Sequence, residues 1–230
     1  QNSEELLLKL QSQKVDIIKE LYNVCVKIHN TRIKVAKEIE AKVEKELATL
    51  GMKNTKFTIM FNQLPDIENA QFTTSGFDTI EFMFSANAGE QQRSLVKTIS
   101  GGELSRFMLA IKNVFASCED TNLLIFDEID SGVSGEVGYL VGQKLAILSK
   151  TYQIICITHL PQVTALADNY IYISKQVEGE HTKSVASYLT TEQLASYLVT
   201  LFGSKESTAG LEHAKELITS AQKFKENLNK

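Results

Sequence analysis

The sequence predicts an α/β fold that follows one long N-terminal helix. Residues 1–50 contain neither glycine nor proline, two apolar runs near 123–126 and 153–157 have the length of buried strands, and a helical pattern separates those runs. A strand, a helix and a second strand in this order predict two parallel strands that are covered by helices.

The first fifty residues predict a coiled-coil arm, because apolar side chains recur at heptad spacing. Seven of nine a and d positions are apolar, the nine being Leu7, Leu10, Lys14, Ile17, Leu21, Val24, Ile28, Thr31 and Val35. After Val35 the apolar residues continue in steps of four, which is typical of a stutter. A helix of this length would extend about 75 Å, more than a small core requires. The alternative is an ordinary amphipathic helix in a bundle.

The residues after Gly51 predict a globular part, so we divide the chain into an arm at 1–50 and a globular region at 51–230. Alternating apolar residues predict half-buried strands in "KFTIMFN" and "DTIEFMF". "TNLLIFDE" and "QIICITH" predict fully buried strands, with a helix at about 136–150 between them. Two edge strands are predicted in "NYIYISKQ" and "SVASYLTT", and two closing helices near 191–202 and 206–222.

Composition limits the class of protein. A hydrophobic fraction of 43% in 230 residues is enough for a real core, and a net charge of −4 gives no overall basic field for nucleic acid. The three cysteines, Cys25, Cys118 and Cys156, have no metal-binding spacing and predict buried thiols in a reducing compartment. No apolar run approaches the roughly 18 residues of a membrane span, and no signal peptide opens the chain, so we expect a soluble intracellular protein.

The segment "SGGELSRFMLAIKNVF" predicts a helix that begins with a capping box between Ser100 and Glu103. Spacings of three and four predict one buried face, formed by Leu104, Met108, Ile111 and Phe115. The box does not explain Gly101 and Gly102, because each glycine in a helix costs about 1 kcal/mol relative to alanine. Glycines at a helix start leave the backbone N–H groups open to an anion.

Two carboxylates, Asp127 and Glu128, end the strand "LLIFDE", where open α/β sheets bind ligands. Adjacent strand residues point to opposite sides, so the two acids can act separately. Asp127 is a candidate Mg²⁺ ligand, and Glu128 is a candidate to polarise a water for attack on a γ-phosphate. The alternative is a strand end that is acidic only because it meets solvent.

His159 ends the following strand, so all three side chains are expected to face one crevice. A structural histidine is the alternative reading. The turn "DSGVSG" at 130–135 lies between the two strands, and its small residues allow another backbone to approach closely.

Four segments follow one another along the chain: "SGGELSR", "LLIFDE", the turn at 130–135 and the strand that ends in His159. In this order they resemble the signature motif, Walker B, D-loop and switch histidine of an ABC-type ATPase head. An arm that leads directly into the head narrows the resemblance to the SMC-like branch. The segments "ISGGELSRFMLAIK", "IFDEIDSGVSG", "CITHLPQV" and "LFGSKESTAGLEHAKELI" are similar to the RecN family of DNA-repair proteins. The resemblance implies the C-terminal lobe of an ABC-type P-loop NTPase head with a long N-terminal coiled-coil helix.

The resemblance also implies a role for each matching residue, with ATP and Mg²⁺ as cofactors. Glu128 and His159 would be catalytic, and Asp127 would bind both the metal and the nucleotide. The remaining nucleotide-binding residues would be Ser100, Gly101, Gly102, Glu103, Ser131 and Gly132. The first three of these would contact the γ-phosphate of an ATP that is held mainly by another head.

No P-loop motif, G-x-x-x-x-G-K-[ST], is present, because none of the twelve glycines precedes a lysine and no two lie five residues apart. In the family this Walker A motif lies at the far N-terminus. With a start at Gln1 rather than methionine, we expect a C-terminal piece that begins in the returning arm and is inactive by itself. Its incomplete sheet would then expose edges or apolar faces that seek a partner.

The predicted function is therefore that of an SMC-like ATPase in DNA double-strand break repair and recombination. Its implied partners are the N-terminal half of the same head, a second head in an ATP-dependent dimer, and DNA through the complete protein, with no membrane, in the bacterial cytoplasm at the nucleoid. The alternatives are an SMC-like head with another chromosome-maintenance role and a non-catalytic coiled-coil scaffold that oligomerises. Residues 1–50 carry nine basic and eight acidic side chains, a balance that predicts an arm for protein pairing.

Overall fold

The fold was taken from a computed structural model that describes residues 2–87, 89–95, 99–116, 121–133, 135–178, 181–203 and 207–228. These residues form two compact units, Gln1–Lys45 with Asn54–Ile99 (unit 1) and Glu46–Lys53 with Ser100–Lys230 (unit 2). The buried thiol predicted at Cys118 lies outside the described residues. Unit 1 thus joins the first 45 residues to strands that the sequence grouped with the globular region.

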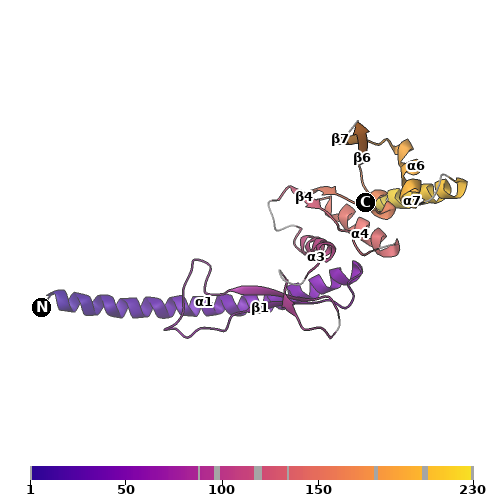
Figure 1. Cartoon of the computed structure of the whole chain (residues 1–230). Helices are drawn as coiled ribbons and strands as arrows, with labels where there is room; N and C mark the ends of the chain where they lie inside the picture. Colours follow the sequence, from indigo (N-terminus) through magenta and orange to yellow (C-terminus); the bar gives the residue numbers. More distant parts are fainter. Residues whose placement is uncertain are drawn as a thin grey trace. The chain divides into compact units, whose positions relative to one another are not determined.

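Helix α1 covers Asn2–Thr49 without a break, which confirms one long N-terminal helix (Figure 1). Gly51 follows its end, and the φ of this residue, 84°, lies in the left-handed region. The N–H of Met52 donates to the Leu47 carbonyl at 3.0 Å, the bond of a Schellman cap. A side chain at position 51 would also clash with Val137, since an added Cβ would lie 2.9 Å from Cγ1 of that residue.

Unit 1 contains an antiparallel sheet of three strands, β1 (Lys56–Phe61), β2 (Ile80–Ser85) and β3 (Arg93–Ser94), in the order β1-β2-β3. Phe57 pairs with Phe84 in the register of β1 and β2, and both side chains are buried. Further along the same face, Phe82 and Ile80 are exposed. The two predicted strands are confirmed, and their apolar face is more deeply buried at Phe57 and Phe84 than towards Ile80.

Two glutamates of α1 bind the backbone of β1. Oε1 of Glu44 accepts the N–H of Phe57 at 3.1 Å, and Oε1 of Glu40 accepts the N–H of Ile59 at 2.8 Å. Four residues of helix rise about 6 Å and two residues of strand about 6.8 Å, so the two spacings match. The helix therefore saturates donors at the edge of β1 that no other strand pairs in the described sheet.

A buried ion-pair network fixes the segment before β2 to α1. Asp78 binds Nδ1 of His29 at 2.5 Å and Nη1 of Arg32 at 2.7 Å. Burial raises the pKa of Asp78. Hydrogen bonds and charge from His29 and Arg32 together lower this pKa by more than burial raises it, so it lies below the ordinary value. The hydroxyl of Tyr22 adds a hydrogen bond to the Pro65 carbonyl at 3.0 Å.

Unit 2 contains the predicted strand–helix–strand element. Helix α3 (Gly101–Val114) is followed by β4 (Leu123–Phe126), α4 (Gly135–Leu148), β5 (Gln153–Cys156) and the short α5 (Pro161–Thr164). Strands β4 and β5 are parallel, in a register that runs from Leu123 opposite Gln153 to Phe126 opposite Cys156. The parallel pair predicted from the sequence is confirmed.

The prediction that both strands are fully buried is wrong for one face. Phe126 is buried, but Ile125 is 64% exposed and Ile157, just after β5, is 57% exposed. Leu123 and Ile155, which lie two residues earlier and so on the same face, are exposed as well. The apolar runs have the length of buried strands, yet none of the described residues covers this face of the pair. We call it the open face, and it consists of Leu123, Ile125, Ile155 and Ile157.

The predicted buried face of α3 is also wrong. Leu104 and Met108 are 40% and 38% exposed, whereas Phe107, Leu109 and Ala110 are buried. Nearly every side of this helix carries apolar residues, so periodicity alone could not select the packed side. The packed side also contains the buried Arg106.

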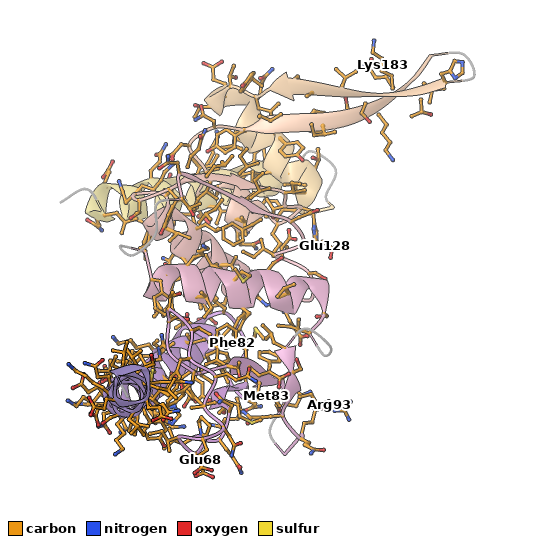
Figure 2. The ribbon with its side chains drawn as sticks, turned by 90° about the vertical axis from the view of Figure 1, so that its left-hand side faces the viewer. Glu68, Phe82, Met83, Arg93, Glu128 and Lys183 are labelled. Atoms are coloured by element: carbon orange, nitrogen blue, oxygen red, sulfur yellow. The ribbon has the colours of Figure 1, made fainter. Side chains whose placement is uncertain are left out.

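The chain ends with a hairpin and two helices. Strands β6 (Ile171–Glu178) and β7 (His181–Tyr188) pair antiparallel and form a ribbon that projects from the neighbouring helices and carries Lys183 (Figure 2). Helices α6 (Thr191–Leu201) and α7 (Thr208–Leu228) confirm the two predicted closing helices. They enclose a small core with α5, made of Ala165, Leu166, Leu194, Leu198, Val199, Ala214 and Ala221. Among the described helices, none has the length and hydropathy needed to cross a bilayer.

Candidate functional site

The carboxyl ends of β4 and β5 bring Asp127, Glu128 and His159 to one edge of the parallel pair. The Phe126 carbonyl accepts the N–H of Ile157 at 2.9 Å, so the pairing continues to the last residue of β4. Asp127 and Glu128 follow on one strand, and Thr158 and His159 follow on the other. We call this edge the strand-end site.

Asp127 is held by two local hydrogen bonds. Its Oδ1 accepts the N–H of Glu128 at 2.9 Å, and its backbone carbonyl accepts the hydroxyl of Ser105 of α3 at 2.6 Å. The first bond orients the Asp127 carboxylate, and the second fixes the end of β4 to α3.

Glu128 has an unusual backbone conformation. Its φ is 56°, and it is the only residue other than glycine with a positive φ among those that the structure describes. A side chain in the left-handed region costs on the order of 1–3 kcal/mol, a strain that gathers at active sites and switch regions. This left-handed conformation turns the chain sharply at the end of β4.

The Glu128 carboxylate lies at the start of α3. A Cβ added to Gly101 would be 2.6 Å from Oε2 of Glu128, and Figure 2 labels Glu128 beside the same end of this helix. The exposed N–H groups of a first helical turn favour a negative charge. Glu128 therefore occupies the kind of position where an external anion would bind.

Ser100 and Glu103 form the predicted capping box at this helix start. Both the backbone N–H and the hydroxyl of Ser100 donate to Oε2 of Glu103, at 3.1 and 2.7 Å. The Ser100 hydroxyl is thereby held at the mouth of the helix.

Gly102 is required by packing within the chain. An added Cβ would lie 2.7 Å from Cβ of Ser131, 3.0 Å from the Ser131 carbonyl oxygen and 3.1 Å from the Glu128 carbonyl oxygen. Two of these atoms belong to the backbone, so the turn after β4 can approach α3 only if position 102 has no side chain. Gly101 is exposed and has no such constraint.

Arg106 holds the same turn from inside, a role that sequence reasoning missed. Its Nη1 donates to the carbonyls of Ser131 at 2.6 Å and Ile129 at 3.3 Å. Burial lowers the pKa of Arg106, and the negative charge of Glu103 opposes that effect. The available signal was an arginine within an apolar helix, since a buried guanidinium must find several acceptors.

The turn also depends on its own backbone. The N–H of Ser131 donates to the Glu128 carbonyl at 3.0 Å, and Gly132 follows with a φ of 73°. Ser131 and Gly132, both predicted to contact nucleotide, thus lie on an exposed tight turn. Ser134 of the predicted turn lies outside the described residues.

Asp130 is the second residue that the sequence did not single out. Its buried Oδ2 accepts the Thr158 hydroxyl at 2.5 Å and the N–H of His159 at 2.8 Å. Nδ1 of His159 lies 3.1 Å from the same oxygen. Asp130 therefore joins the turn after β4 to the end of β5.

The strand-end site alone fits only part of a metal site. Among the described residues, no group of three or more His, Cys, Asp or Glu side chains could hold a metal ion. Mg²⁺ is commonly bound by one or two carboxylates together with phosphate oxygens and water. Asp127 fits that pattern if a nucleotide supplies the remaining oxygens.

Comparison with solved structures defines the class. A Pyrococcus yayanosii Smc head domain with a coiled coil and joint has a TM-score of 0.55 at 21% identity, covering 83% of this chain and 34% of that chain. A Pyrococcus furiosus Smc head domain has a TM-score of 0.51 at 21% identity, covering 84% and 45%. The fold is thus that of an SMC head domain, although no family model matches the chain.

Comparison with curated proteins then gives the family. The DNA repair protein RecN of Bacillus subtilis is 35% identical over 98% of this chain and 41% of its own length. RecN of Treponema pallidum is 41% identical over 80% of this chain and 32% of its own length. The chain belongs to the RecN family, and it spans about two fifths or less of the length of these relatives.

Proposed function

We propose that this chain is the C-terminal part of an SMC-like ATPase that acts in DNA double-strand break repair and recombination. The observation that carries the proposal is the strand-end site: Asp127, Glu128 and His159 follow the ends of two parallel strands, and the Glu128 carboxylate lies against Gly101 of α3. Relatives named for DNA repair support the biological role. ATP binding would join two heads, and hydrolysis would release them.

Each residue of the strand-end site has a role in phosphoryl transfer. Asp127 would hold Mg²⁺, which neutralises phosphate charge when it is bound. Glu128 would orient the attacking water and accept its proton, and His159 would contact the γ-phosphate. The protein's contribution is positioning and charge stabilisation, as is general for this chemistry.

The start of α3 would bind the γ-phosphate of a nucleotide that is held by a second head. The exposed Gly101 offers its backbone N–H there, and the Ser100 hydroxyl, which now donates to Glu103, would turn its proton to the phosphate. Because Glu128 of the same chain now lies against Gly101, an arriving phosphate would repel its carboxylate. Head engagement would therefore free Glu128 for catalysis. Ser131 and Gly132 would lie between the two ATP sites of the head dimer.

The open face supports the other proposed partner, the N-terminal half of the same head. Two exposed isoleucines, Ile125 and Ile157, lie directly before the strand-end site. Burying the open face against another part of the protein would remove its apolar side chains from water. The half that carries Walker A is the natural partner for it, because that half would have to reach the same nucleotide. DNA would be bound by the complete protein, in the bacterial cytoplasm.

ATP turnover by this chain mixed with its Walker A-bearing half tests the proposal. We expect turnover only in the mixture, with loss in Glu128→Gln. Glu136→Gln, which removes an exposed carboxylate from the next helix, is the matched control and should stay active. A folded mixture that binds ATP but never hydrolyses it, with or without DNA, would contradict an ATPase.

One observation favours the alternative of a non-catalytic coiled-coil module. The seam predicted on α1 is largely exposed, including Leu7, Leu10, Ile17 and Val24. In the ATPase proposal, residues 1–50 are part of an arm whose seam pairs with the outgoing helix. Sedimentation distinguishes the two: a scaffold would form stable oligomers of this chain that persist when the Walker A half is added.

A further inference from the structure

Asp130 binds the end of β5 through a single carboxylate oxygen. Oδ2 receives the Thr158 hydroxyl and the His159 N–H at 2.5 and 2.8 Å, and it lies 3.1 Å from Nδ1 of His159. The Asp130 side chain is only 4% exposed, whereas the His159 side chain is 74% exposed. A buried carboxylate thus binds the backbone N–H of His159 and lies within ion-pair distance of an imidazole that otherwise faces solvent.

This proximity favours one position of the ring proton. An ionised carboxylate oxygen offers only lone pairs, and at 3.1 Å it would repel the lone pair of an unprotonated Nδ1. We therefore expect Nδ1 to carry the proton in both the neutral and the charged imidazole, which leaves Nε2 for another ligand. The group that faces one ring nitrogen sets what the other can do.

The oxygen that holds His159 belongs to the turn that Arg106 ties to α3. The Arg106 guanidinium binds the carbonyls on both sides of Asp130, those of Ile129 and Ser131. Thr158 strengthens the same junction, since its hydroxyl also accepts the N–H of Leu160 at 3.1 Å. A shift of the turn would therefore move the Asp130 carboxylate and, with it, the His159 ring.

We propose that Asp130 is the positioning residue for His159, holding the imidazole with its proton on Nδ1 so that Nε2 is presented to the γ-phosphate. The contact between Nε2 and the γ-phosphate rests on the proposed ATPase function. The orientation of the His159 ring and the position of its proton are inferred from contacts within this chain alone. The pair also gives the turn at 130–133 a direct means to control His159.

Long-range ¹H–¹⁵N correlation spectra of the ¹⁵N-labelled chain test the tautomer without nucleotide. They are recorded at alkaline pH, well above the ordinary histidine pKa of about 6.5. We expect His159 to show a protonated Nδ1 and an unprotonated Nε2, with His159→Gln assigning the signals. In Asp130→Ala, which removes the oxygen beside Nδ1 and puts no other acceptor there, the proton should no longer be confined to Nδ1, and signals of a protonated Nε2 should appear.

Controls separate this effect from general damage. Glu136→Gln removes an exposed carboxylate with the same change of charge and should leave His159 unaltered. Thr158→Val removes another donor to Oδ2 and should keep the proton on Nδ1. His213, which is exposed and whose Nδ1 lies 3.9 Å from Glu216, is an internal reference that should not change.

The wild-type spectrum is decisive even if Asp130→Ala fails to fold. A wild-type His159 with its proton on Nε2 would overturn the proposal, as would a folded Asp130→Ala whose His159 keeps its proton on Nδ1 alone. Turnover with the Walker A half gives a separate readout: Asp130→Ala should lower kcat about 10- to 100-fold, as the loss of a residue that orients another commonly does, with KM for ATP nearly unchanged. If the wild-type mixture has no turnover while the tautomer is as expected, the ATPase function fails and the positioning of His159 stands.

Discussion

At the scale of single residues, Gly101 and Gly102 are adjacent but have different surroundings. A Cβ at Gly102 would meet backbone oxygens of Ser131 and Glu128, which cannot move without shifting the turn. A Cβ at Gly101 would meet only the mobile end of the Glu128 side chain. One glycine serves packing, and the other keeps the helix start open.

Alanine substitutions should separate these two roles. Gly102→Ala should lower the free energy of unfolding by about 1–3 kcal/mol, as overpacking does. Gly101→Ala should be neutral or slightly stabilising, because alanine is favoured over glycine in a helix by about 1 kcal/mol. Urea unfolding of both variants measures the difference, and equal stabilities would contradict the packing role of Gly102.

Asp78 should make unit 1 sensitive to acid. Its folded pKa lies below the unfolded value of about 3.9, so its contribution is fully present above that pH and is lost as pH falls through the folded pKa. Asp78→Asn should lower the free energy of unfolding at pH 7 and flatten its decline at acid pH. Unfolding curves of wild type and variant from pH 7 to 3 measure this, and parallel curves would refute it.

The sequence could predict Asp127, Glu128 and His159, because each follows an apolar run that becomes a strand. It could not predict Asp130 or Arg106. Their partners are backbone carbonyls and strand-end groups that are more than 20 residues away, and local patterns contain no information about such partners.

At the scale of elements, α1 replaces a strand at the edge of β1. Glu40 and Glu44 accept backbone N–H groups of Ile59 and Phe57. Glu40→Ala would leave the N–H of Ile59 without its acceptor, so we expect a loss of about 1–3 kcal/mol in the free energy of unfolding and faster amide exchange at Ile59. Glu38→Ala, on the exposed side of α1, is the matched control and should change neither.

The absence of glycine and proline was enough to predict the length of α1. The partnership of α1 with β1 was not predictable, because glutamates along a helix ordinarily indicate a solvated face. The packed side of α3 was missed for another reason: two apolar stripes were available, and long-range packing selected the one beside Arg106.

At the scale of the whole molecule, the open face of β4 and β5 should be an interface. Ile125→Asn should change the free energy of unfolding of this chain by less than about 0.5 kcal/mol, because its side chain is already exposed. It should weaken binding of the Walker A half, as measured by titration calorimetry. Phe126→Ala, on the covered face, should instead destabilise the chain by about 3–5 kcal/mol. Unchanged binding by Ile125→Asn would exclude this face from the interface.

The central claim is that two heads share each ATP site, with Ser100 from one head and Glu128 from the other. Its most direct measurement is ATP turnover after mixing two inactive variants, Ser100→Arg and Glu128→Gln, each with the Walker A half. Random pairing into two-fold dimers leaves one intact site in the mixed dimers, so about a quarter of wild-type turnover should return. Turnover that stays absent in the mixture, although each variant folds and binds ATP, would contradict a site shared between heads.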